Sequence, residues 1–186
     1  LPVIVDNTVL TPALFRPIEH GIDIVLYSTT KFIGGHGLHV GGAVVDSGNF
    51  RWEDNPRKWP EFTTPDEAYH GMVFTEALKP HGNLSYIMHM RTHWLRDTGA
   101  CQSPFGSFLF LLGIETLPIR MQQHTRNALE LAKWLEQHPA VAWVNYPGLE
   151  SHKHYALARR YLHDGAGAIL GFGIHGGRKA GVRFID

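Results

Sequence analysis

The N-terminal part of the chain alternates between short apolar runs and polar or glycine-rich connections. The apolar runs at 3–5, 22–27 and 42–45 are rich in β-branched residues, and each of them predicts a strand. The first run is continuous enough to indicate a buried strand of a parallel sheet. Residues 13–20 predict a short helix, limited by Pro17, between the first two strands. A strand, a helical connection and a second strand form a βαβ unit, so we expect an α/β sheet.

Farther along, the pattern becomes helical. Residues 47–74 contain several prolines and show no regular period, which predicts a long irregular segment of the kind that often carries function. Apolar residues spaced three or four apart predict a helix over about 84–95 and a longer helix over 117–137. Ser103 stands before a proline, which is typical of a helix start. The remaining predicted elements are strands over 141–146 and 168–174 and helices over 155–162 and 180–186.

Composition is typical of a globular protein and excludes several classes. Hydrophobic residues make up 44% of the chain and charged residues 18%, so the chain is not disordered. The 17 basic residues balance 17 acidic ones, which gives no argument for a nucleic-acid or membrane partner. Cys101 is the single cysteine, so no intrachain disulfide can form and we expect a cytoplasmic protein.

Polar residues follow two of the predicted strands at the point where each strand ends. Asp6 follows the first run, and the second run is followed by Ser28, Thr30 and Lys31. Ligands of open α/β sheets bind at the carboxyl ends of the strands. A partly desolvated lysine can act as a Schiff-base nucleophile, hydroxyls can bind phosphate, and a carboxylate can pair with a cationic ring nitrogen. Together these groups describe a pyridoxal-phosphate site, although spacing alone leaves an ordinary solvated loop lysine open.

Two motifs in this region carry a family resemblance. Residues 23–36 resemble the lysine signature of the Cys/Met-metabolism family of pyridoxal-phosphate enzymes. Residues 5–8 resemble the aspartate motif of the same family, and the spacing between Asp6 and Lys31 also fits. Within the family, residues 52–71 resemble the extra loop of the O-acetylhomoserine sulfhydrylases. Downstream matches at 103–105, 112–117, Arg120, 127–128 and 144–148 extend the resemblance over nearly the whole chain.

The resemblance implies a fold-type-I transferase that depends on pyridoxal 5'-phosphate. Residues 1–118 would form the C-terminal part of the large cofactor-binding domain, and residues 119–186 would begin a small C-terminal α+β domain. In this family the glycine-containing phosphate loop and the ring-stacking tyrosine would precede this chain, and the arginine for the substrate carboxylate would follow it. We therefore expect a fragment of a larger enzyme, one that assembles as a homotetramer.

The resemblance also implies a role for each candidate residue. Lys31 would hold the cofactor as a Schiff base and, once freed, would carry protons as a general acid–base. Asp6 would pair with the pyridine nitrogen, and Ser28 and Thr30 would donate hydrogen bonds to the phosphate. The implied reaction is γ-replacement on O-acetyl-L-homoserine by sulfide or a thiol, which yields homocysteine or methionine plus acetate. A methionine γ-lyase, a cystathionine γ-synthase and a non-catalytic remnant of the fold are the alternatives.

The thirteen histidines of the chain raise the question of a metal site. His36 and His39 lie among glycines, and His152 and His154 form a His-x-His pair, but no third ligand converges by spacing. We therefore expect no metal site. The glycines at 34–42 lack the spacing of a nucleotide-binding loop, so we expect them to allow tight turns and close approaches of the backbone.

Overall fold

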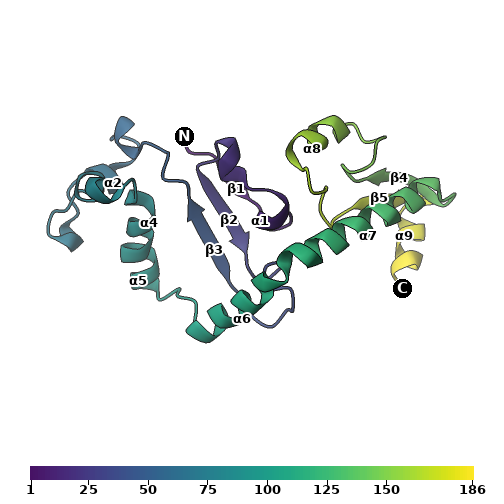
Figure 1. Cartoon of the computed structure of the whole chain (residues 1–186), viewed down its shortest axis with the longest axis horizontal. Helices are drawn as coiled ribbons and strands as arrows, with labels where there is room; N and C mark the ends of the chain where they lie inside the picture. The colour runs from purple at the N-terminus through teal and green to yellow at the C-terminus, as the bar shows by residue number, and fades with distance from the viewer. The chain divides into compact units, whose positions relative to one another are not determined.

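The structure is a computed structural model that describes residues 1–186 (Figure 1). The chain folds into two compact units, each built from separate stretches of sequence. Unit 1 comprises Leu1–Asp6, Pro17–Ser28 and Gly41–Phe108, and unit 2 comprises Asn7–Arg16, Thr29–Val40 and Leu109–Asp186. Segments of the two units alternate along the sequence, so these units do not coincide with the predicted domains 1–118 and 119–186. That residues 1–118 and 119–186 belong to a large and a small domain stays a prediction.

A three-stranded sheet forms part of unit 1 (Figure 1). Strand β1 (Ile4–Asp6) pairs in parallel with β2 (Ile24–Ser28), and β2 pairs antiparallel with β3 (Gly42–Asp46). The three predicted strands and the parallel pairing of the βαβ unit are confirmed. The prediction that the first strand is buried is wrong, because β1 lies at the edge of the sheet and Ile4 is 53% exposed.

The connection between the first two strands differs from the predicted single helix over 13–20. The chain instead forms α1 (Thr11–Leu14) and, after a break, the 3-10 helix η1 (Pro17–His20). Phe15 is extended and ends α1. Proline disfavours helical geometry at the residue before it, so Pro17 starts a new element and does not merely shorten the predicted one.

The segment predicted to be irregular over 47–74 holds several short helices. They are η2 (Trp52–Asp54), α2 (Pro60–Thr63) and η3 (Glu67–Tyr69), and α3 (Phe74–Ala77) and η4 (Lys79–His81) follow them. Aromatic rings hold this region together. The ring centroid of Trp52 lies 4.6 Å from those of Phe50 and Phe62, and its ring stacks on Tyr86. These rings pack against Ile24 of β2, so aromatic burial orders a segment that has no sequence period.

The helical segment that follows changes its geometry midway. It consists of α4 (Ser85–His89), the π-helix η5 (Met90–Leu95) and α5 (Arg96–Thr98). A π-turn inserts extra backbone into each turn and rotates the side chains that follow it. The apolar face predicted over 84–95 is therefore not continuous, and Trp94 is 65% exposed.

Helices α6 (Pro104–Glu115) and α7 (Leu117–Gln137) come next along the chain (Figure 1). The Oγ of Ser103 accepts a hydrogen bond from the N–H of Gly106 at 3.0 Å, which confirms the predicted cap. The bounds of α7 are those predicted. Its buried positions are Leu117, Met121, Ala128, Ala132 and Leu135. Leu131, which has the same spacing, is 48% exposed, so the core stripe is narrower than the sequence indicates.

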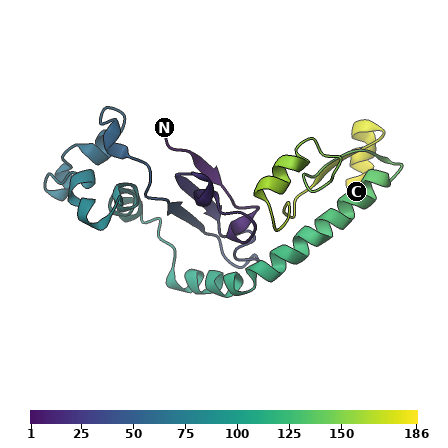
Figure 2. The ribbon, with the colours of Figure 1, turned by 45° about the horizontal axis from the view of Figure 1, so that its top comes forward.

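The C-terminal part of unit 2 lies along α7 (Figure 2). Strands β4 (Val141–Asn145) and β5 (Gly171–Ile174) form an antiparallel pair, accompanied by α8 (Tyr155–Tyr161) and α9 (Gly177–Ile185). These elements confirm the prediction for this region. The buried Tyr146 donates its hydroxyl hydrogen to the carbonyl of Gly167 at 2.8 Å, and burial raises the pKa of this phenol. No helix in the structure is both long enough and apolar enough to cross a membrane.

Candidate functional site

Two of the predicted site residues lie at the carboxyl end of the sheet in unit 1. Asp6 is the last residue of β1, and Ser28 is the last residue of β2. The parallel register places Asp6 opposite Leu26, two residues before Ser28. Paired residues of neighbouring strands share a face, and side chains two residues apart on a strand also share one. The side chains of Asp6 and Ser28 therefore project from the same face of the sheet.

The other two predicted residues lie in the turn that begins unit 2. Thr30 is half-buried and Lys31 is exposed. Two backbone hydrogen bonds of 2.8 Å close this turn, from the N–H of Gly34 to the carbonyl of Thr29 and from the N–H of Gly35 to the carbonyl of Lys31. The backbone of Lys31 is thus held in place while its side chain remains accessible.

Arg120 near the start of α7 holds the residues directly after Lys31. Its Nη1 donates to the carbonyl of Phe32 at 2.8 Å. Its Nη2 donates to the carbonyl of Ile33 at 3.3 Å and to the carbonyl of Gly113 at 2.7 Å. Burial lowers the pKa of this guanidinium. The fixed fork of donors suits several carbonyls at once, so Arg120 acts as a clamp on the turn.

Glycines allow α6 to approach this turn closely. A Cβ at Gly113 would overlap the carbonyl oxygens of Ile33 and Gly34. A Cβ at Gly34 would come within 2.9 Å of the carbonyl oxygen of Thr29. Gly35 has a φ of +75°, which side chains rarely adopt. The expectation of tight turns and close backbone approaches is thus confirmed for Gly34 and Gly35.

One buried hydroxyl of the turn has no hydrogen-bond partner. The Oγ1 of Thr29 is buried and has no hydrogen-bond partner in the structure. An unsatisfied buried hydroxyl costs about 1–3 kcal/mol, so such atoms need an explanation. Thr29 lies between Ser28 and Thr30 in the sequence, and an acceptor supplied by a ligand would satisfy it. An accessible amine, a run of hydroxyls and a strand-end carboxylate are the chemical groups that pyridoxal phosphate requires.

Sequence patterns alone assign no role to Arg120. Arg120 is one matched position among several that carry the family resemblance. The available sequence signal is the presence of glycine at 34, 35 and 113, which indicates a close approach of backbone segments. A close approach leaves carbonyls that need donors, and an arginine nearby in space can supply them.

A second group of titratable residues lies in unit 1 and was missed. Ligand atoms of Asp66, His89 and His93 all lie within 4.8 Å of one another. The Nε2 of His93 lies 2.8 Å from Oδ2 of Asp66. Burial and the neighbouring His93 lower the pKa of His89, although Glu61 and Asp66 oppose this shift. The sequence signal was the i, i+4 spacing of the two histidines on a helix.

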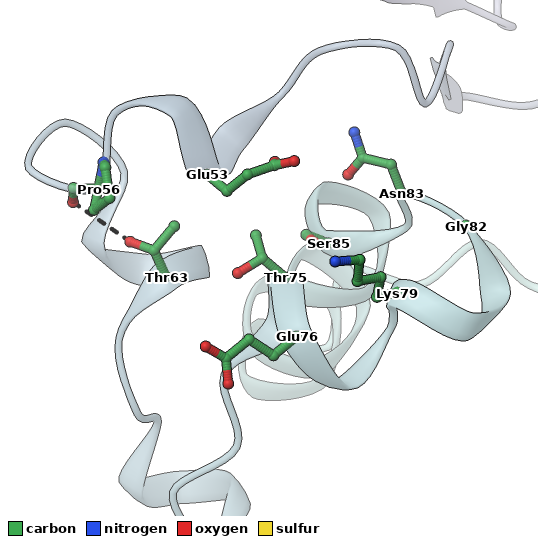
Figure 3. Close-up of a pocket in the computed structure, with 9 residues that line it drawn as sticks. All are labelled: Glu53, Pro56, Thr63, Thr75, Glu76, Lys79, Gly82, Asn83 and Ser85. Carbon is green, nitrogen blue, oxygen red and sulfur yellow. Dashed lines mark hydrogen bonds between the residues drawn. The ribbon is translucent and has the colours of Figure 1, made fainter.

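Figure 3 shows a pocket of about 440 Å³ in unit 1 that contains none of the predicted site residues. Its polar side chains are partly used to hold the surrounding loops. The Oγ1 of Thr75 donates to the carbonyl of Phe62 at 3.1 Å, and Nδ2 of Asn83 donates to the carbonyl of Phe50 at 2.5 Å. We therefore assign these polar side chains a structural role.

Comparison with known proteins identifies the family. The model of the Cys/Met metabolism PLP-dependent enzymes matches residues 1–186. A homocysteine/cysteine synthase of Saccharomyces cerevisiae is 54% identical over 94% of this chain and 39% of its own length. An O-acetyl-L-homoserine sulfhydrylase of Leptospira meyeri is 46% identical over 100% of this chain and 43% of its own length. The chain thus spans about two fifths of the length of these relatives.

Solved structures agree with the sequence comparison. A Campylobacter jejuni structure assigned as an O-acetylhomoserine (thiol)-lyase, with a pyridoxyl-lysine monophosphate, matches with a TM-score of 0.84 and 34% identity. It covers 94% of this chain and 42% of the other. A cystathionine gamma synthase of Xanthomonas oryzae matches with a TM-score of 0.71 and 35% identity, over 100% of this chain and 38% of the other. The chain therefore belongs to the Cys/Met-metabolism family of enzymes that depend on pyridoxal phosphate, with the fold predicted from its motifs.

Proposed function

We propose that the protein to which this chain belongs replaces the acetyl ester of O-acetyl-L-homoserine with sulfide or a thiol. The products are homocysteine or methionine, together with acetate. The observation that carries this proposal is Lys31, an accessible lysine on a turn held rigidly after β2. Relatives named homocysteine synthase and O-acetyl-L-homoserine sulfhydrylase support the choice of reaction.

Lys31 is the residue proposed to hold the cofactor covalently. The same amine then moves protons on and off the substrate carbons as a general acid–base. The cofactor, when bound, supplies an electron sink that stabilises negative charge on the α-carbon of the substrate. The hydrogen-bonded backbone of the turn fixes the point from which this amine reaches the substrate.

Three further residues are proposed to hold the cofactor. Asp6 pairs with the ring nitrogen and keeps it protonated, which strengthens the electron sink. Ser28 and Thr30 donate their hydroxyl hydrogens to the phosphate group. The shared face of Asp6 and Ser28 at the carboxyl end of the sheet supports their participation in one site.

A cytoplasmic location and a homotetrameric assembly belong to the same proposal. The single cysteine and the family resemblance support the location, and the resemblance alone supports the tetramer. Light scattering coupled to size-exclusion chromatography of the whole protein measures the assembly. A monomer would contradict the proposed tetramer.

A cystathionine γ-synthase is the second candidate, because one such enzyme shares the fold with a TM-score of 0.71. The stretch at 52–71, which resembles the extra loop of the sulfhydrylases, argues against it. This stretch supplies Trp52, Trp59 and Phe62 to the aromatic core of unit 1. A methionine γ-lyase is the other member of the family to be tested.

One assay of the whole purified protein with pyridoxal phosphate separates these reactions. O-acetyl-L-homoserine is supplied with sulfide, with methanethiol or with cysteine, and methionine is supplied alone. Homocysteine or methionine with an equal amount of acetate is the expected result. Cystathionine from cysteine would instead indicate the synthase, and α-ketobutyrate from methionine would indicate the lyase.

A further inference from the structure

We propose that Asp66, His89 and His93 form a binding site for a divalent transition metal ion of the zinc class. This proposal is independent of the proposed enzymatic function, and it departs from the expectation of no metal site. One carboxylate oxygen and two imidazole nitrogens lie within 4.8 Å of one another. Zinc binds such donors at about 2.0–2.2 Å, so its ligand atoms lie roughly 3–4 Å apart. The present spacing is close to that requirement.

The choice of metal follows from the donor set. Imidazole nitrogen favours zinc, copper, nickel and iron, whereas calcium and magnesium take oxygen ligands. Two histidines and one carboxylate leave a fourth position of a tetrahedral ion for water. The side chains of His93 and Asp66 are 25% and 14% exposed, so an ion can reach the site from solvent.

The two histidines are brought together by the helix that carries them. His89 ends α4, and His93 lies in the π-helical turn η5. Their rings stack with centroids 4.1 Å apart and planes 14° apart. Each ring can therefore offer one nitrogen to the same ion.

Asp66 is held in place by its own loop. Its Oδ1 accepts a hydrogen bond from the N–H of Ala68 at 2.9 Å and caps η3. Its backbone is also bonded on both sides, because its N–H donates to Met72 at 3.0 Å and its carbonyl accepts from Gly71 at 2.8 Å. The second carboxylate oxygen, Oδ2, is thereby left directed at His93.

The hydrogen bond on the far side of His93 favours the form that binds metal. The hydroxyl of Thr92 donates to the carbonyl of Met88 at 2.8 Å, so its oxygen accepts from Nδ1 of His93 at 3.0 Å. A proton on Nδ1 leaves a lone pair on Nε2, the atom that faces Asp66. Nε2 of His93 and Oδ2 of Asp66 lie 2.8 Å apart, so one cation can contact both atoms. Metal-binding histidines characteristically donate their other N–H in this way.

Aromatic rings complete the surroundings of the site. Phe74 lies 5.4 Å from the ring of His89 and 5.9 Å from that of His93, and Phe62 lies 5.3 Å from His89. Such an apolar wall limits the movement of the ligands and strengthens electrostatic attraction. A hydrogen bond from Arg96 of α5 to the hydroxyl of Tyr69 in η3, at 2.9 Å, already connects the two segments that carry the ligands. A bound ion would join η3 to the helical segment of residues 85–98 and act as a crosslink within unit 1.

The test measures metal binding by the full chain without any assay of activity. The protein is stripped with a chelator and titrated with Zn²⁺ against a chromophoric competitor, and in parallel with Co²⁺, whose visible absorption reports nitrogen and oxygen coordination. We expect one equivalent to bind. Asp66→Asn, His89→Gln and His93→Gln should each weaken binding by about 100-fold or more, beyond the roughly 10–100-fold loss typical of an outer-sphere partner.

Two kinds of control keep this test decisive. His152→Gln is the first control. The Nε2 of His152 is hydrogen-bonded to Asn145 and its ring contacts that of His154, away from the proposed site, so metal binding should not change. Asp66→Asn keeps the oxygen that caps η3, and circular dichroism verifies that the variants are folded. Thr92→Val should weaken binding by roughly 10-fold, whereas Thr92→Ser should not. The proposal is overturned if no stoichiometric Zn²⁺ binds, or if the ligand variants bind as tightly as the wild type.

Discussion

Arg120 donates a hydrogen bond from Nη1 to the carbonyl oxygen of Phe32 at 2.8 Å, directly after the lysine proposed to hold the cofactor. Phe32 and Arg120 are far apart in the sequence, yet this contact and those to Ile33 and Gly113 fix the turn. A lysine that must act at one atom needs a backbone that does not move. Arg120 therefore links the start of α7 to the position of Lys31.

Arg120→Lys should destabilise unit 2. A lysine keeps the charge but cannot supply the planar fork that reaches three carbonyls. Loss of charge-assisted hydrogen bonds costs about 1.5–3 kcal/mol each, so we expect the free energy of unfolding to fall by at least about 2 kcal/mol. Urea denaturation measures the change. Arg126→Lys on the same helix is the control, since Arg126 is exposed and bonds only to Gln123; equal losses for both variants would refute the clamp.

Gly113→Ala should also loosen the turn, because the added methyl group overlaps the carbonyls of Ile33 and Gly34. Overpacking of this kind costs typically about 1–3 kcal/mol. Gly181→Ala is the matched control in a helix, where no atom lies within 4 Å of the added methyl group. The control should be neutral or stabilising by up to about 1 kcal/mol. A thermal melt compares the two, and a tolerated Gly113→Ala would argue against the close approach.

Asp46 predicts a dependence of stability on pH. Burial raises the pKa of Asp46 above its ordinary 3.8, the N–H of Gly48 partly opposes this, and Asp23 adds to the rise. Oδ2 of Asp46 is buried without a partner. The native state holds its proton to higher pH than the unfolded state, so stability falls as pH rises from 3.8 through the raised native pKa.

Asp46→Asn removes this penalty while keeping an oxygen for the N–H of Gly48. The variant should be more stable than the wild type at neutral pH by up to about 1 kcal/mol, and this gain should vanish below pH 3.8. Urea denaturation across the pH range measures both effects. Asp54→Asn is the control, because Asp54 is exposed and its ion pair with Arg51 contributes little. A gain that does not depend on pH would contradict the explanation.

Asp6→Asn should separate binding of the cofactor from its activation. The variant retains the lysine and the hydroxyls, so the cofactor should still bind covalently. An amide holds the ring proton less well, and we expect turnover of O-acetyl-L-homoserine to slow by roughly 100-fold. Absorbance of the bound cofactor and the rate of acetate release measure the two properties. Unchanged turnover would remove Asp6 from the proposed site.

The elements that could be predicted from the sequence are those set by local periodicity. Helix α7 begins and ends where its apolar spacing and flanking prolines indicate, because each signal lies within a few residues of its effect. Strands β2 and β3 are similar cases. The apolar pattern likewise placed Lys31 just past the second strand, and in the structure it lies in the turn after β2.

Features that depend on distant contacts could not be predicted in this way. Trp52 orders its segment through rings that come from several places in the chain, so no period marks the short helices there. The π-turn at Met90–Leu95 shifts the phase of a helix without a clear sequence signal. Asp66 lies near His89 and His93 only because the chain folds back on itself. The contact between Arg120 and Phe32 likewise joins residues that are far apart in the sequence.

The central claim is that Lys31 holds the cofactor, and the most direct test is a trapping experiment. The whole protein is incubated with pyridoxal phosphate, reduced with borohydride and analysed by intact mass and peptide mapping. We predict one phosphopyridoxyl group on the peptide that contains Lys31, its absence in Lys31→Ala, and its retention in Lys79→Ala. An adduct that persists in Lys31→Ala, or no adduct on the wild-type protein, would contradict this account.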